Sequence, residues 1–139
     1  MLFESAFFVG EYMSRTEQRE QAFCLVFQNL FNNEETLAIY EENVAKVGNY
    51  AKVLFEGVDS KIEELDEVIN AYSKGWKTNR LPKVNLAILR LAIYEIKYVD
   101  DVPASVAINE AVELAKKYSG EGDYSFINGI LGSVAKGEE

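Results

Sequence analysis

The 139-residue chain has no histidine, one cysteine and two prolines. The absence of histidine removes the side chain that most often serves as a general acid or base near neutral pH and as a metal ligand. The single thiol, on Cys24, has neither a second cysteine for an internal disulfide nor a histidine for a catalytic dyad. No apolar run reaches the length of about 18 residues that spans a bilayer, and the amino-terminal segment lacks the basic start of a secretory signal. These absences predict a cytoplasmic protein with no membrane segment.

Motifs that hold phosphates or cofactors are missing as well. The chain contains neither GxGxxG nor GxxxxGK[ST], and no pair of acids stands in a context that would hold two carboxylates around a substrate. Glu95 borders an apolar stripe, and we expect it to form a structural ion pair with a base such as Lys116 rather than to act in catalysis. The sequence therefore predicts no enzyme, no cofactor and no metal site.

Length and hydrophobic content indicate one folded unit. A chain of 139 residues that is 48% hydrophobic is long enough for one compact core and too short for a second catalytic domain. Residues 1–12 offer no helix cap, and we treat them as a tail of uncertain origin. Met13 is a candidate for the true start, and residues 13–139 form the predicted single helical domain.

Apolar residues recur at steps of three or four along the rest of the chain, and no segment alternates with a period of two. This pattern predicts an all-α fold, a compact bundle of about six or seven helices. Ser14 and Glu17 have the spacing of a capping box, and Ser105 and Asp123 are candidate caps of two later helices. Helices are expected over residues 14–33, 35–47, 49–73 with a stop at Gly75, 82–98, 106–118 and from 123 onward.

Two glycines, Gly129 and Gly132, fall inside the last expected helix. Each costs about 0.5–1 kcal/mol relative to alanine in that position. We expect the close approach of a neighbouring helix to explain both. A ligand pressed against bare backbone is the alternative.

The net charge disfavours a phosphate ligand on average. It is −9, and residues 1–12 hold two of the acids and none of the bases, which leaves −7 for the rest. The distribution is uneven, because residues 56–67 carry six acids and one base whereas residues 76–90 carry four bases and no acid. An acidic protein of this kind can present one basic face. Ordinary solvated helix surface is the alternative explanation of both segments.

A series of motifs runs through nearly the whole chain, from about Arg15 to Leu131. The motifs are REQAFCLVFQ at 19–28, GVDSKIEELDEVI at 57–69, Trp76 with Arg80–Leu81, ILRLAIYE at 88–95, VPASVAINEAVELAK at 102–116 and FINGIL at 126–131. In order and in spacing they resemble the NusB family of bacterial transcription antitermination factors.

This resemblance implies a fold, a function and a set of partners. The fold would be two perpendicular helical sub-bundles without enzymatic activity. NusB-like proteins pair with NusE, a ribosomal protein of the small subunit, and the pair binds the single-stranded boxA element of a nascent RNA. The loaded pair then joins RNA polymerase with other Nus factors and suppresses premature termination, notably in ribosomal RNA operons.

The resemblance also places RNA-binding residues on this sequence. The family's arginine-rich segment falls on Arg15 to Arg19, whose bases would neutralise phosphates. Thr16, Glu17 and Gln18 replace much of the basic run here, which should weaken RNA binding by the protein alone.

Further RNA contacts are expected from the acid-free segment and from the carboxyl-terminal motifs. Lys83 belongs to the acid-free segment. Tyr118 and Phe126 align with family aromatics, and each ring would either stack on an unstacked base or belong to the core. A loop acid of the family aligns near Asp123.

The NusE contact maps onto two positions. Phe27 aligns with a family aromatic and lies off the apolar stripe of its helix, so it is either an exposed contact waiting for a partner or a simple core residue. Asn85 stands where the family has an acid.

Two other functions remain open at this level. One is a helical module that binds only protein, with a homodimer among its forms, and the net acidity favours it. The other is a relative of the NusB-like domain that precedes some ribosomal RNA cytosine methyltransferases. That alternative needs a cofactor-binding α/β domain after Leu131.

Overall fold

The computed structural model describes residues 13–75 and 77–138. Over these residues the chain forms seven α-helices and two short 3-10 turns, with no strand, so the expected all-α fold is confirmed. The tail at 1–12 and Trp76 lie outside the described residues. The helices are α2 (Arg15–Asn29), α3 (Asn33–Glu42), α4 (Asn49–Ser60), α5 (Ile62–Tyr72), α6 (Lys83–Tyr98), α7 (Ala104–Tyr118) and α8 (Asp123–Gly137), and the turns are η2 (Val44–Lys46) and η3 (Thr78–Arg80).

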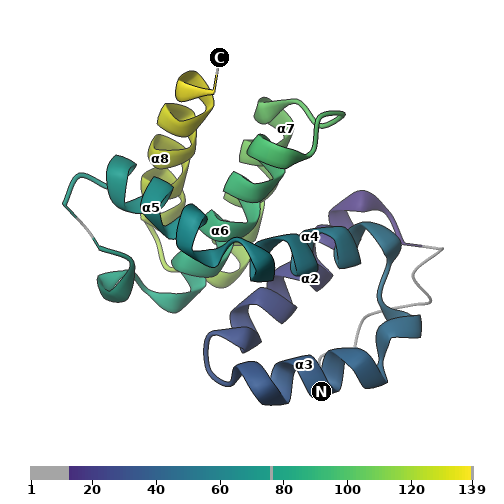
Figure 1. The fold of residues 1–139 in the computed structure, drawn as a ribbon. Helices are drawn as coiled ribbons and strands as arrows, with labels where there is room; N and C mark the ends of the chain where they lie inside the picture. The colour runs from purple at the N-terminus through teal and green to yellow at the C-terminus, as the bar shows by residue number, and fades with distance from the viewer. Residues whose placement is uncertain (1–12, 76, 139) are drawn as a thin grey trace.

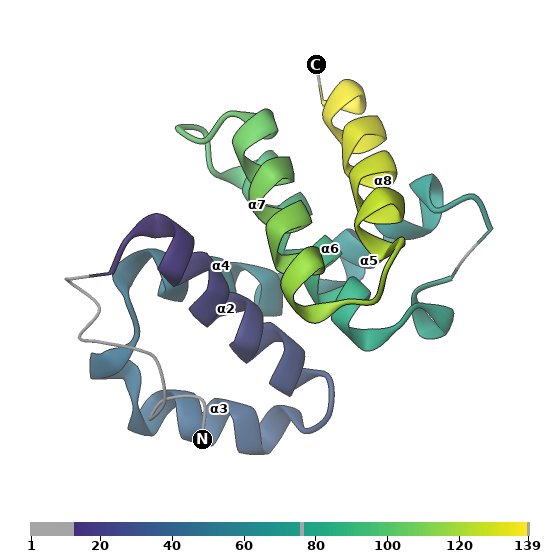
Figure 2. The same ribbon diagram turned by 180° about the vertical axis from the view of Figure 1, so that it is seen from behind.

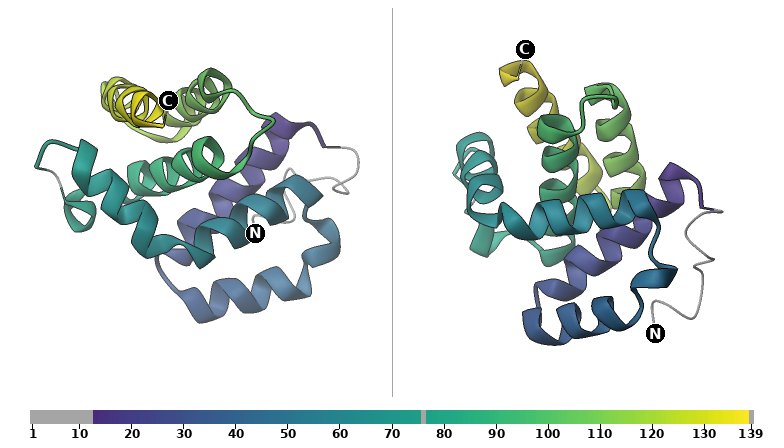
Figure 3. Two further views of the ribbon diagram at one scale, coloured as in Figure 1. Left: turned by 45° about the horizontal axis from the view of Figure 1, so that its top comes forward. Right: turned by 45° about the vertical axis from the view of Figure 1, so that its right-hand side comes forward.

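The helices form two groups that cross each other. Helices α2, α3 and α4 make one group. Helices α7 and α8 rise steeply across the direction of that group, and they form the second group with α5 and α6 (Figure 1). From behind, α7 descends onto the middle of α2 (Figure 2). Two further views agree that α3 lies on the far side of α2 and α4 from α7 and α8 (Figure 3). This is the expected arrangement of two crossed sub-bundles.

Helix α6 lies at the centre of the molecule. It contacts α2 and α4 of the first group and α5, α7 and α8 of the second. Every residue from Asn85 to Ile93 is buried, which is the pattern of a helix covered on all sides. The two groups therefore share one core rather than enclosing two separate ones.

The start of α2 follows the expected capping box. The Ser14 hydroxyl accepts the backbone N–H of Glu17 at 3.1 Å, and the Glu17 carboxylate accepts the N–H of Ser14 at 2.9 Å. This reciprocal pair satisfies two of the amide groups that a helix start leaves without partners. From there Ala22, Leu25 and Val26 enter the core as expected.

Several expected boundaries were wrong. The single helix expected over 49–73 is two helices, because Lys61 leaves the helical conformation between α4 and α5. The residue before α7 is Pro103 rather than Ser105, and the residue before α8 is Gly122 rather than Asp123. Gly122 has φ of 88°, a left-handed conformation that glycine adopts at little cost.

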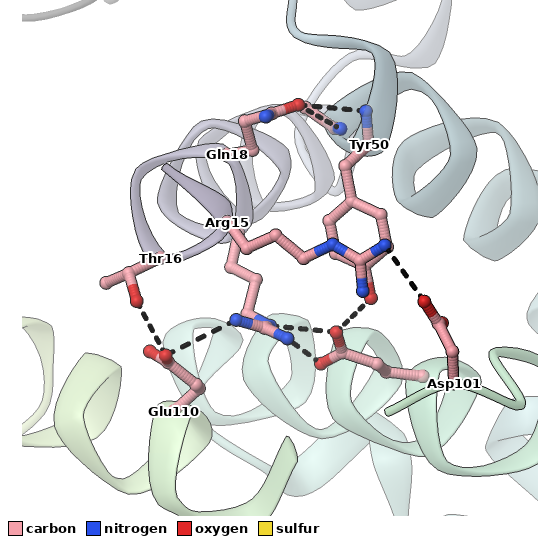
Figure 4. A network of polar contacts seen from close by, with 9 residues as sticks. Arg15, Thr16, Gln18, Tyr50, Asp101 and Glu110 are labelled. Atoms are coloured by element: carbon pink, nitrogen blue, oxygen red, sulfur yellow. Dashed lines mark hydrogen bonds and ion pairs between the residues drawn. The ribbon is translucent and has the colours of Figure 1, made fainter. Parts of the chain in front are cut away.

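A buried polar network joins the two groups of helices. Arg19 of α2 is 5% exposed and its Nε lies 2.8 Å from the carboxylate of Glu95 on α6, which is 1% exposed. The Tyr50 hydroxyl of α4 donates to the same carboxylate, and Glu110 of α7 lies 3.3 Å from the Arg19 guanidinium. Figure 4 shows this network with the neighbouring contacts of Arg15 and Thr16.

The expected partner of Glu95 was therefore wrong. Lys116 lies 3.4 Å from Glu113 of its own helix, whereas Arg19 takes the place beside Glu95. A planar guanidinium can donate two N–H groups to one carboxylate, and the Arg19 Nε lies within 3.1 Å of both Glu95 oxygens. The expected structural role of Glu95 is consistent with this ion pair.

The explanation expected for the glycines of α8 was also wrong. A Cβ placed on Gly129 or Gly132 would meet nothing within 4 Å, so no neighbouring helix requires a glycine at either position. Gly57 of α4 shows the opposite case, because a Cβ there would collide with the Tyr94 ring. Across the described residues, no helix is both long and apolar enough to cross a membrane.

The substitution Glu95→Ala is expected to lower the free energy of unfolding by about 3–5 kcal/mol, because it leaves the buried Arg19 charge without its main partner. Asp101→Ala is the matched control, since it removes only the exposed partner of Arg15 and should cost less than about 1 kcal/mol. Urea unfolding followed by circular dichroism measures both losses. Equal losses would contradict the central role of the buried pair.

The substitution Gly129→Ala is expected to raise the free energy of unfolding by about 0.5–1 kcal/mol, because the added methyl group meets open space and alanine favours the helix. Gly57→Ala should lower it, since the methyl group displaces the Tyr94 ring. The same denaturation experiment compares the two. A destabilised Gly129→Ala variant would show that this face of α8 is not open.

Candidate nucleic-acid interface

A row of aromatic rings follows α2 and continues into the turn after it. Phe23 and Phe27 stack with ring centroids 6.0 Å apart, and Phe27 meets Phe31 edge-on at 5.1 Å. The row continues onto α7, where the Tyr118 ring lies 4.9 Å from Phe23. Steps of four residues place these side chains on the same side of a helix. We call Phe23, Phe27, Phe31 and Tyr118 the aromatic strip.

The aromatic strip emerges from the core toward both of its ends. Phe23 is buried and Phe27 is half-buried, whereas Phe31 is 61% exposed and Tyr118 is 39% exposed. The ammonium group of Lys83, at the start of α6, lies 5.5 Å from the centre of the Phe31 ring. Exposed rings beside a cation offer flat apolar faces for a base or for apolar side chains of a partner.

The Tyr118 end of the strip carries paired charges. The carboxylate of Glu20 on α2 accepts hydrogen bonds from the Tyr118 hydroxyl and from the Lys117 ammonium, the latter at 2.6 Å. Beside this cluster lies an open hollow of about 380 Å³ between α2 and α7. Its lining residues are Thr16, Glu20, Glu110, Glu113, Leu114, Lys116 and Lys117.

These contacts change the acidity of both partners. Burial raises the pKa of the Tyr118 hydroxyl, and its hydrogen bond to Glu20 raises it further. Burial alone would raise the pKa of Glu20, but the hydrogen bonds from Lys117 and Tyr118, with the Lys117 charge, bring it below its ordinary value. Glu20 is therefore ionised and Tyr118 protonated near neutral pH.

The structure brings three of the expected site residues together. Phe27 and Tyr118 both pack on Phe23, and Lys83 lies over the ring that follows Phe27 in the strip. Sequence reasoning missed Phe23 and Phe31, which are the links between them. Their spacing of four residues on either side of Phe27 is the signal that could have found them.

Two expected site residues are buried, which argues against the roles assigned to them. Arg19 was expected on the RNA surface, but it faces α6 and is enclosed between Glu95 and Glu110. Asn85 was expected at the partner surface, but it is 2% exposed and its side-chain oxygen accepts the Ser119 hydroxyl at 2.7 Å. Both side chains are buried because Arg19 faces α6 and Asn85 belongs to it, and helices of both groups cover α6.

Arg15 stays exposed but stands apart from the strip. It begins α2, about 12 Å along the helix from Phe23, the nearest ring of the strip on α2. Its guanidinium lies 3.3 Å from Asp101 and 4.0 Å from the centre of the Tyr50 ring. The Arg15 charge is thus accessible but already has a carboxylate and an aromatic face beside it.

The last two expected RNA contacts lie on α8. The Asp123 carboxylate accepts the backbone N–H of Gly120 at 3.1 Å and so closes the loop after α7. Phe126 is half-buried against the core and lines a separate hollow between α5 and α8 with Tyr72 and Lys74. Neither residue has a described contact with the strip.

No candidate metal cluster is found in the described part of the chain. Over residues 13–75 and 77–138, no three acids, cysteines or histidines lie close enough to hold a metal ion. Cys24 lies under the Tyr118 end, where burial, followed by the Glu20 charge, raises the pKa of its thiol to about 11. A thiol of this kind is a poor nucleophile at neutral pH.

The NusB family model matches residues 16–136. The chain belongs to the NusB family. The transcription antitermination protein NusB of Acetivibrio thermocellus is 49% identical over 131 residues, which cover 89% of this chain and 90% of that protein. The NusB protein of Lachnoclostridium phytofermentans is 42% identical over 130 residues, which cover 88% of this chain and 98% of the relative.

Solved NusB structures have the same fold. The T. maritima NusB structure superposes with a TM-score of 0.80 at 35% identity, over 89% of this chain and 92% of that one. A structure of the antitermination factors NusB and NusE in complex with double-stranded RNA gives a TM-score of 0.74 at 27% identity, over 90% and 99% of the two chains. The resemblance found in the motifs is therefore confirmed.

The native protein is expected to resist a thiol-specific disulfide dye at pH 8, because a pKa of about 11 leaves about one thiol in a thousand ionised. Unfolding in urea should expose Cys24 and restore rapid reaction. The rate of dye release with and without urea makes the comparison. Prompt reaction of the native protein would contradict the burial of this thiol.

Proposed function

We propose that this protein is a transcription antitermination factor that binds boxA-type single-stranded RNA together with NusE. The observation that carries the proposal is the aromatic strip, a row of rings whose two exposed ends lie beside cations on a protein with net charge −9. Membership of a family whose relatives are named transcription antitermination protein NusB supports it. So does the likeness to a NusB chain solved with NusE and RNA.

The Tyr118 end of the strip is the proposed RNA-binding end. Single-stranded RNA presents unstacked bases, and one base on an aromatic ring contributes about 1–3 kcal/mol. Lys117 beside the ring and Lys83 at the other end supply charges for phosphates. Arg15, Asp123 and Phe126 lie off the strip, and we propose them only as flanking contacts.

The Phe27 and Phe31 end of the strip is the proposed NusE-binding end. An apolar side chain as exposed as Phe31 is costly in water and gains from burial against a partner. Two rings in edge contact form the kind of aromatic anchor on which protein interfaces depend. Lys83 stands beside this anchor and could serve a phosphate held between the two proteins.

The remaining steps of the proposed function lie beyond this chain. The RNA-loaded pair would join RNA polymerase with other Nus factors and prevent premature termination, notably in ribosomal RNA operons. We propose no enzymatic step and no cofactor for this function. We propose that the protein acts in the cytoplasm, where transcription occurs in bacteria.

A titration of labelled boxA RNA with this protein, with and without its cognate NusE, tests the proposal at a fixed and stated salt concentration. We expect the affinity for RNA to rise when NusE is present. No gain with NusE would reject the joint mechanism. NusE binding without any RNA binding would favour the protein-only module, and sedimentation of the protein alone would reveal a homodimer.

The substitution Tyr118→Leu is expected to weaken RNA binding by the protein with NusE, by a factor corresponding to about 1–3 kcal/mol, because leucine offers no flat face to a base. Tyr98→Leu is a close control. Like Tyr118, Tyr98 is partly exposed (38%), donates a hydrogen bond to a glutamate, Glu64, and has a lysine ammonium near its ring, at 5.0 Å. It is the last residue of α6, however, at the opposite end of that helix from Asn85, which bonds Ser119 next to Tyr118. Equal losses in both variants would argue against the strip.

A further inference from the structure

Lys117, the cation beside the Tyr118 ring at the RNA-binding end of the strip, is already paired with a carboxylate. The Lys117 ammonium lies 2.6 Å from the Glu20 carboxylate, well within hydrogen-bond distance of a charged pair. The same carboxylate accepts the hydroxyl of Tyr118. One acid from α2 therefore holds both the charge and the ring that α7 presents.

The two partners of this contact differ in their access to solvent. The Glu20 side chain is 24% exposed, whereas the Lys117 side chain is 60% exposed. The acid, which lines the hollow, is thus the more buried of the two, and the cation is the more exposed. An incoming phosphate can reach Lys117 from the open side, but it meets an ammonium group that already forms an ion pair with Glu20.

The other acids of the hollow have different partners. Glu113 pairs with Lys116 one turn away on its own helix, at 3.4 Å. Glu110 accepts the Thr16 hydroxyl at 2.6 Å and also approaches the buried Arg19. Among the described acids that line the hollow, Glu20 is the one that accepts a hydrogen bond from the aromatic strip.

We infer that Glu20 is an intramolecular competitor of RNA, a carboxylate that holds Lys117 in the place of a backbone phosphate. The inference rests on the proposed function. A carboxylate and a phosphate both present anionic oxygens that accept the same N–H donors. RNA must therefore exchange with Glu20 to gain Lys117, and Glu20 remains as a repelling charge next to the bound strand.

Two consequences follow for binding. The protein should bind RNA more weakly than its exposed cations suggest, because this contact is an exchange of one anion for another. Its salt dependence should also be shallow, because a lysine that is already paired releases fewer counterions from the RNA. Both effects should depend on the charge of Glu20 rather than on its shape.

The substitution Glu20→Gln tests this inference. Glutamine keeps an oxygen that can accept the Tyr118 hydroxyl, so only the charge is removed. We expect the variant with NusE to bind boxA RNA at least several-fold more tightly than the natural protein. The slope of log affinity against log salt should become steeper by about 0.7, the value for one more phosphate contact on a single strand.

Two control variants separate this effect from a general change of charge. Glu113→Gln removes one acid from the same hollow without touching the strip. Glu64→Gln removes the acid that holds Tyr98 at the far end of α6. Both should change the affinity much less than Glu20→Gln, and equal gains in all three would overturn the inference.

A double substitution gives a second measurement that does not depend on one variant. Lys117→Gln should weaken RNA binding less in the natural protein, where Glu20 holds the ammonium, than in the Glu20→Gln variant, where the ammonium is free to meet a phosphate. In the Glu20→Gln background it should abolish the gain. Independent effects of the two substitutions would overturn the inference.

The outcomes also separate this inference from the proposed function. If the natural protein with NusE does not bind boxA RNA, the proposed function fails. If it binds, and Glu20→Gln binds equally or less tightly while its melting temperature is unchanged, the function stands and the competitor is rejected. If that variant melts lower, the effect of Lys117→Gln in the two backgrounds decides, because a loss as large in the natural protein as in the Glu20→Gln variant means that Glu20 does not compete for the ammonium and overturns the inference.

Discussion

The ion pair between Arg19 and Glu95 is the contact on which the arrangement of the two helical groups depends. Hydrophobic burial favours any close packing of α2 on α6, because it has no preferred direction. A buried guanidinium and carboxylate tolerate little displacement, since either charge without its partner would be costly in the core. The hydroxyl of Tyr50 adds a third helix to the same carboxylate. The network thereby fixes how α2 is turned about its own axis.

That orientation explains why the rings of α2 form a surface. With Arg19 directed inward at α6, Phe27 stays half-buried against the core, and Phe31, in the turn after α2, is exposed. Helix α7 then reaches the same edge and adds Tyr118 to the row. The buried ion pair thus helps to place a row of rings drawn from two helices.

Much of the fold could be predicted from the sequence, and the parts that could not have physical reasons. Apolar spacing identifies the helices because the core requires it, and the box of Ser14 and Glu17 places a start by local hydrogen bonds. The break at Lys61 carries no glycine or proline, so tertiary packing decides it. Asn85 is polar yet buried because α6 is covered on every side, which its own helix pattern does not reveal.

Ala22, Leu25 and Val26 of α2 fill the core, whereas Phe31, in the turn that follows α2, is exposed to solvent. A substitution of Phe31 therefore removes little of the buried packing of the bundle. The partner that this surface binds can therefore change in evolution while the fold is kept. For protein engineering, the separation between core residues and exposed rings makes the carboxyl-terminal end of α2 a site at which binding specificity can be changed without a change of fold.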